Sequence, residues 1–183
     1  MIRESIIKLI YAHSMTFPNN EANAFDAVWT ADALAERVET TFITKSISAS
    51  RRKLQAYYYL HHSNLRFQSL CLNHIPDRLL LSVENYTAKA LSCYLRVHPK
   101  WAWHKGTKVL YTREPKLLSY FGSQRKRQKW LKDWVLVYES HDPLGYDPNQ
   151  FKDDEPYKND PEILTAAANF DIFICNTQAL ADD

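Results

Sequence analysis

Glycine is scarce in this sequence. Only three of the 183 residues are glycine, at positions 106, 122 and 145. A glycine-rich nucleotide loop, of either the GxGxxG or the Walker type, needs at least two glycines within about six residues of each other. The spacing of these three glycines excludes both motifs, and with them the best-known loops for binding a dinucleotide or a nucleoside triphosphate.

The sequence also has few cysteines, no long apolar run and little net charge. Cys71, Cys93 and Cys175 lie far apart without a CxxC spacing, and two of them sit within apolar segments. They are expected to be reduced thiols in the core, which fits a reducing, cytoplasmic compartment. The sequence has no uncharged apolar run of about 18 residues, and its first ten residues do not resemble a signal peptide. The formal net charge is only +2, so bulk charge does not indicate a polyanion binder.

Strand-like and helix-like segments alternate along the chain. The stretch 134–143 begins as a β-branched apolar run, which is typical of a strand buried on both faces of a parallel sheet. Further strands are expected at 6–13, 38–44, 65–72, 108–112 and 170–175. Helices are expected at 22–36, 48–59, 78–97, 115–120, 124–132 and 161–168, with Gly122 as an interruption. The alternation predicts one α/β domain over residues 1–183, a Rossmann-like three-layer sandwich with a mostly parallel sheet.

Polar side chains follow several of these predicted strands. Arg113 comes directly after the strand at 108–112, and Glu139, His141 and Asp142 end the stretch that begins at Trp134. In a parallel sheet these strand ends share one edge, where ligands of open α/β sheets bind. The combination of a cation, carboxylates and an imidazole suits a polar ligand that is phosphorylated or rich in hydroxyl groups.

Each of these candidates has a structural alternative. Arg113 and Glu139 could form an ion pair across neighbouring strands, and His141 could cap the turn that follows its strand. Asn20 and Asn23, in the loop after the first strand, belong to a residue type that is common in turns and helix caps. No metal site is expected, because the acidic residues at 153–155 are consecutive in a polar loop and resemble a solvated segment.

Two basic clusters lie beside tryptophans. One spans 125–132 and is close to Trp130 and Trp134, and the other spans 100–105 and includes Trp101 and Trp103. Basic residues interleaved with aromatic rings can bind an anionic membrane surface or nucleic acid. The alternative is a solvated helix face beside core tryptophans. Of the two partners the membrane surface is favoured, at about 1 kcal/mol per basic residue, and nucleic acid is not expected.

The succession of four segments resembles a known family. These segments are KLIYAHSMTFPNNEANAFDAVWTADALAERVETTFIT, VLYTRE, VLVYESHDP and FDIFICNTQALADD, and they follow one another in order over nearly the whole length of the chain. They are similar to the N-terminal domain of GT-B type retaining glycosyltransferases, the glycosyltransferase subfamily 4-like domain. The resemblance implies a Rossmann-like domain that forms one half of a GT-B architecture and holds the acceptor.

The resemblance also implies roles for individual residues. His141 is expected to lie beside the transferred sugar as the catalytic residue. The residues expected to border the substrate are Asn20, Asn23, Arg113, Glu139 and Asp142. The loop at 18–23 carries asparagines where many relatives have paired glycines.

The E-x7-E motif of the family's donor-binding domain does not occur in the sequence. The chain is therefore expected to be the acceptor-side half of a longer or split enzyme, and inactive alone. No cofactor of its own is expected, because the nucleotide-sugar donor would bind mainly to the other domain. The expected partners are a sugar or lipid-linked acceptor, a C-terminal donor-binding domain or separate chain, and an anionic membrane surface. The alternative is a stand-alone Rossmann-like binding or interaction module without catalysis.

Overall fold

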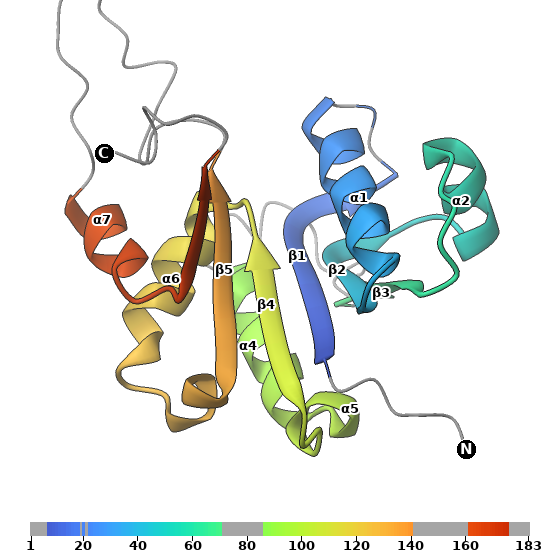
Figure 1. Cartoon of the computed structure of the whole chain (residues 1–183). Helices are drawn as coiled ribbons and strands as arrows, with labels where there is room; N and C mark the ends of the chain where they lie inside the picture. Colours follow the sequence, from blue (N-terminus) through green and yellow to red (C-terminus); the bar gives the residue numbers. More distant parts are fainter. Residues whose placement is uncertain (1–6, 19, 21, 71–85, 141–160, 176–183) are drawn as a thin grey trace, which may run out of the picture.

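The six strands in the described part of the chain form one sheet in which every neighbouring pair is parallel. The computed structural model of the chain describes residues 7–18, 20, 22–70, 86–140 and 161–175 (Figure 1). The strands are β1 (Ile7–Phe17), β2 (Glu39–Ile47), β3 (Leu65–Ser69), β4 (Thr107–Thr112), β5 (Trp134–Ser140) and β6 (Ile172–Cys175). Their order is β3-β2-β1-β4-β5-β6, the doubly wound order of Rossmann-like folds. The predicted fold class is confirmed.

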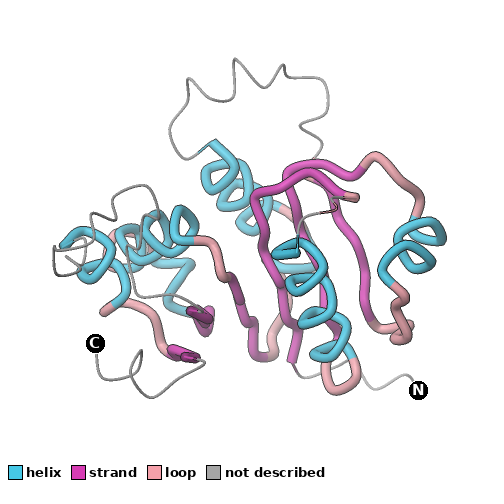
Figure 2. The backbone as a smooth tube through the Cα atoms, turned by 90° about the horizontal axis from the view of Figure 1, so that it is seen from above, coloured by secondary structure: helices cyan, strands magenta, loops and turns pink. Residues whose placement is uncertain are grey.

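Helices cover both faces of the sheet, which gives three layers (Figures 1 and 2). One face carries α1 (Ala22–Ala35) and α2 (Arg51–Tyr58), and the other carries α4 (Tyr86–Val97), α5 (Pro99–Ala102), α6 (Pro115–Arg125) and α7 (Pro161–Ala167). The division follows from handedness. Right-handed crossovers from β1 to β3 run outward in one direction, and those from β4 to β6 run in the other, so their helices lie on opposite faces.

Each face has its own buried core. On the α1 face, the small side chains of Ala24, Ala27 and Ala31 let the helix approach a row of aromatic rings on the sheet. In that row the ring centroids of Tyr11 and Phe42 are 5.4 Å apart. The core of the other face joins α4, α5 and α6 to the strands through Ile10, Leu91, Leu95, Trp101, Leu110, Phe121 and Leu136. Each large side chain buried in this way stabilises the fold by about 1.5–3 kcal/mol.

The first strand is longer than the sequence predicts. The segment 14–20 was expected to be a loop, but β1 continues to Phe17. Its pairing with β2 shifts register between His13 and Thr16 and then resumes, with Thr16 opposite Ser46 and Phe17 opposite Ile47. Continued backbone pairing with the long neighbouring strand outweighs the polar side chains of this segment, which would otherwise favour a loop.

Gly122 does not interrupt its helix, so that prediction is wrong. Helix α6 runs without a break from Pro115 to Arg125, and only the piece after it is separate, as a 3-10 helix over Lys129–Asp133. Gly122 is buried, and an ideal Cβ there would lie 2.8 Å from the Cα of Ala166 and closer still to its carbonyl group. The glycine is needed because α6 and α7 touch backbone to backbone.

The prediction of core thiols fails for Cys93. This residue is exposed on α4, and Cys175 is half-buried on the edge strand β6. Cys71 lies outside the described residues, as does the first part of the helix expected at 78–97. Apolar sequence neighbours are a poor guide here, because an amphipathic helix exposes whichever side chains lie opposite its buried stripe.

Candidate functional site

The order of the sheet reverses between β1 and β4, and two polar pairs lie at the C-terminal ends of these strands and β5. In doubly wound sheets this reversal point is where ligands bind. Thr112, the last residue of β4, donates a hydrogen bond from its hydroxyl group to the Ala12 carbonyl, at 3.1 Å. The same hydroxyl accepts the backbone N–H of Glu114 at 3.0 Å. Thr112 therefore fixes the end of β4 against β1 and orients the chain that follows.

The first polar pair joins β1 to the residue after β4. Nδ1 of His13 lies 2.9 Å from Oε1 of Glu114, and both side chains are largely buried. The His13 ring also packs on Phe42 and Phe17, with centroid distances of 6.2 and 5.6 Å. Carboxylate and rings together hold the imidazole in one orientation. An imidazole held in this way suits hydrogen bonding or proton exchange with a polar ligand.

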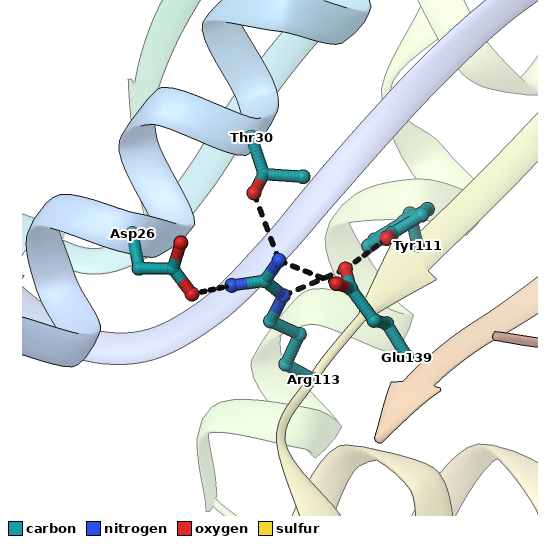
Figure 3. Close-up of polar contacts among 5 residues, drawn as sticks. All are labelled: Asp26, Thr30, Tyr111, Arg113 and Glu139. Atoms are coloured by element: carbon teal, nitrogen blue, oxygen red, sulfur yellow. Dashed lines mark hydrogen bonds and ion pairs between the residues drawn. The ribbon is translucent and has the colours of Figure 1, made fainter. Parts of the chain in front are cut away.

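The second pair is a bidentate ion pair between Arg113 and Glu139 (Figure 3). Nε of Arg113 donates to Oε2 of Glu139 at 2.7 Å, and Nη2 donates to Oε1 at 2.6 Å. Nη1 pairs with Asp26, and Nη2 also donates to Thr30 at 2.8 Å. Parallel hydrogen bonds of this kind are among the strongest and most directional in proteins. The guanidinium group therefore ties α1 to the ends of β4 and β5.

Two tyrosines lie below this network. The hydroxyl group of Tyr111 donates a hydrogen bond to Oε2 of Glu139. The Tyr11 ring stacks on that of Tyr111 at a centroid distance of 5.0 Å, and its buried hydroxyl group has no hydrogen-bond partner among the described residues. Burial raises the pKa of both hydroxyl groups, and for Tyr111 the hydrogen bond to Glu139 raises it further. Both tyrosines are therefore neutral at physiological pH.

The charge of Arg113 is secured by its partners. Burial alone would lower the pKa of the guanidinium group, but the hydrogen bonds to Glu139 and the nearby carboxylate of Asp26 outweigh burial and raise it. The network thus holds one permanent cation against two carboxylates. With Glu114 included, the residues of the two pairs and Asp26 supply three carboxylates and one guanidinium group.

Arg113 and Glu139 form an ion pair across neighbouring strands, which is the structural alternative given for them above. Their contact with a substrate stays a prediction. Sequence reasoning missed Asp26 and Thr30 as partners of Arg113. The only indication in the sequence was the spacing of Asp26 and Thr30. Polar residues four positions apart lie on the same face of a helix, and here that face differs from the one that carries the alanines.

The remaining predicted site residues are not brought into this network by any described contact. Asn20 is exposed just before α1. The side chain of Asn23 and all of His141 and Asp142 lie outside the described residues. Where the chain is described, no three His, Cys, Asp or Glu side chains are grouped to hold a metal ion. Within the same ranges, no helix combines the length and the apolar character needed to cross a bilayer.

The basic cluster at 125–132 does not interleave with surface aromatics. Arg125 donates to the Trp134 carbonyl at 2.6 Å and to Asp171 at 3.0 Å. Trp134 is buried, and Trp130 is half-buried with its ring 6.2 Å from that of Trp134. The tryptophans belong to the core, and the remaining basic residues form a solvated face beside it. The packing of this cluster is therefore that of a solvated face beside core tryptophans, the structural alternative given above.

Comparison with known proteins adds no relative. The chain matches no protein-family model, no curated protein and no solved structure. The glycosyltransferase resemblance therefore stays a prediction that rests on the four sequence segments.

Proposed function

We propose that this domain is the acceptor-binding half of a retaining, nucleotide-sugar-dependent glycosyltransferase. The observation that carries the proposal is the linkage of three strand ends by the His13–Glu114 and Arg113–Glu139 pairs, at the reversal point of a Rossmann-like sheet. Ligands of such sheets bind at that point. The order of the four family-like segments supports the same assignment.

The charge of the network around Arg113 and Glu114 favours a hydroxyl-rich ligand over a phosphate. Carboxylate oxygens accept hydrogen bonds from sugar hydroxyl groups. Asp26 is the most exposed of these carboxylates, at 52%, whereas Glu114 and Glu139 are 16% and 13% exposed. Arg113, the cation of this network, is already paired with two carboxylates, and the three carboxylates of the network would repel a diphosphate. An acceptor sugar therefore fits this edge better than the phosphates of a nucleotide-sugar donor.

In this proposal the catalytic group is His141, which follows Ser140, the last residue of β5. Arg113 and Glu139 position the end of β5 and border the acceptor. Asn20, Asn23 and Asp142 are proposed to contact the substrate as well. The lipid-linked form of the acceptor and a donor-binding partner domain belong to the same proposal.

Acceptor binding can be mapped by NMR on the isotope-labelled chain with a panel of methyl glycosides and oligosaccharides. We expect backbone amide shifts that cluster at the C-terminal ends of β1, β4 and β5. Glu114→Gln should weaken binding about tenfold, whereas Glu39→Gln, at the opposite edge of the sheet, should leave it unchanged. Shifts confined to the opposite edge, or none across the panel, would remove the acceptor site.

Sugar transfer is a separate test. The 183-residue chain alone should not transfer labelled sugar from a nucleotide donor, because the family's donor motif is absent from its sequence. When the chain is paired with a donor-binding domain, His141→Ala should lower kcat by about 100-fold or more with little change in Tm. Unchanged kinetics in that variant would exclude His141 from the chemistry.

A second candidate is a Rossmann-like binding module without chemistry. The observation in its favour is that all three guanidinium nitrogens of Arg113 are bonded to protein side chains. Such a module would bind a glycoside in the NMR experiment and give no transfer with any added donor-binding domain.

A further inference from the structure

A cluster of partly exposed aromatic rings lies where α1 meets α2. Trp29 is 51% exposed on α1, and Tyr57 is 42% exposed on α2. Phe25 joins them, with its ring centroid 5.5 Å from Trp29 and 5.6 Å from Tyr57. Large exposed rings that gather in this way mark an interaction surface more often than a chance exposure. We call Phe25, Trp29 and Tyr57 the aromatic surface.

The aromatic surface is held in place by packing and one hydrogen bond. Nε1 of Trp29 donates to the Tyr58 carbonyl at 2.8 Å. Tyr58 itself is fully buried, and its ring centroid lies 4.8 Å from that of Phe25. The rings therefore project from a rigid base where α1 meets α2. Their exposure is a property of the packed helices and not of a loosely held segment.

Positive charge borders these rings. The first turn of α2 carries Arg51, Arg52 and Lys53 and no acidic residue. Lys53 lies one helical turn before Tyr57, on the same side of α2. In the described part of the chain, the side chains of Arg52 and Lys53 have neither a hydrogen-bond nor an ion-pair partner, and both residues are exposed. Asp26, the nearby acid of α1, is engaged by Arg113.

We infer that the aromatic surface and the first turn of α2 dock this domain on an anionic lipid bilayer. Tryptophan and tyrosine rings favour the boundary between lipid and water, because each combines an apolar ring with a polar atom. Lysine and arginine beside them meet the anionic headgroups of the lipid. This surface differs from the basic face at 125–132, whose tryptophans are part of the core.

Lipid fits the arrangement better than nucleic acid does. A base stacks on an open ring face, and nonspecific binding of a single strand needs several such platforms along a charged groove. Here Trp29 and Tyr57 both pack against Phe25, at interplanar angles of 65° and 32°, so the rings form one joined apolar surface. A joined surface suits partial insertion among lipid headgroups. The inference does not depend on the proposed glycosyltransferase function.

Co-sedimentation of the full chain with vesicles tests the inference. One set of vesicles is pure phosphatidylcholine, and the other contains about 30% phosphatidylserine. We expect the chain to bind the anionic vesicles at least about tenfold more tightly. The double variant Arg52→Glu/Lys53→Glu should lose at least about 25-fold in affinity for them, with each basic residue contributing about fivefold. Acidic residues at the start of α2 also suit the helix dipole, so this variant should keep its fold.

The matched control is Lys126→Glu/Arg127→Glu, which changes net charge equally in the exposed turn after α6 and should alter binding by less than about twofold. Tyr57→Gln tests the rings, and it should weaken binding about fivefold with little change in Tm. Equal sedimentation with and without vesicles would overturn the inference, and so would an equal loss in the control variant. Binding to polyuridylate without binding to vesicles would overturn it in favour of nucleic acid.

Discussion

Each edge of the sheet carries a network of paired charges, and the two networks are built differently. At the C-terminal edge Arg113 makes a two-pronged contact with Glu139 and reaches two residues of α1. At the N-terminal edge Lys100 makes single contacts of 3.1 Å with Glu39 and with Thr41, and Arg66 lies 3.8 Å from Glu39. The planar guanidinium group joins three elements in one geometry, whereas the ammonium group acts as a point charge.

Burial has opposite outcomes in these two networks. For Arg113, bonds to carboxylates overcome burial and raise the pKa. For Lys100, burial outweighs the hydrogen bond to Glu39 and lowers the pKa of the ammonium group. For Glu39, the same hydrogen bond lowers the pKa of the carboxyl group against the effect of burial. The edge with the proposed site therefore holds a permanently charged, rigid network. The opposite edge holds a weaker and more exposed one.

The largest effect is expected from removing Arg113. Arg113→Met should lower the free energy of unfolding by about 3 kcal/mol, because it leaves Glu139 largely buried without its charged partner. Urea denaturation of the variant and the parent chain measures the difference. Arg113→Lys should recover less than half of the loss, since lysine cannot reproduce the two-pronged contact. Full recovery by lysine would show that charge alone holds this edge together.

The two tyrosines offer an internal contrast. Tyr111→Phe should cost about 1.5 kcal/mol, because a hydrogen bond to the charged Glu139 is lost. Tyr11→Phe should be neutral or should stabilise by up to about 1 kcal/mol, because the hydroxyl group that it removes is buried without a partner among the described residues. Parallel urea titrations of the two variants test this. Equal losses would mean that Tyr11 is bonded in solution, for example to an ordered water molecule.

The N-terminal edge should tolerate the matched change far better. Lys100→Met should lower the free energy of unfolding by less than about 1 kcal/mol, because the lost contacts are single and partly offset by relief of the buried charge. Nζ of Lys100 also lies 4.6 Å from the centroid of the Trp101 ring, and the sulfur of methionine can form a favourable contact with the same ring in its place. A loss as large as that of Arg113→Met would erase the distinction between the two edges.

The smallest effect concerns pH and Glu39. The bond to Lys100 lowers the Glu39 pKa below its ordinary value of 4.5 although burial opposes the change. The stabilisation is therefore complete above that value and is lost as the pH falls through the lower pKa of the folded state. Because Glu39 is partly exposed, the contribution should be about 0.5 kcal/mol. Glu39→Gln should flatten the dependence of stability on pH below 4.5 by that amount, as urea titrations at stepped pH would show.

The positions of the strands and the class of the fold could be predicted because they depend on local pattern. Apolar β-branched runs at β2, β4 and β5 alternate with helical segments, and that alternation predicts a parallel sheet whatever the individual side-chain contacts are. The polar residues that end β4 and β5 could be assigned to one edge for the same reason. Their partners could not, since Asp26 and Thr30 are separated from Arg113 by 87 and 83 residues.

Features that depend on contact between distant segments were beyond the local pattern. From the sequence, Gly122 was expected to interrupt a helix. In the structure it is the position where the backbones of α6 and α7 come into close contact. The stretch after His13 resembles a loop, yet it pairs with β2. Trp130 resembles a surface ring among lysines, yet it packs against Trp134. Local composition sets the elements and their order, whereas the environment of each side chain depends on which elements meet, and that is a property of the packed whole.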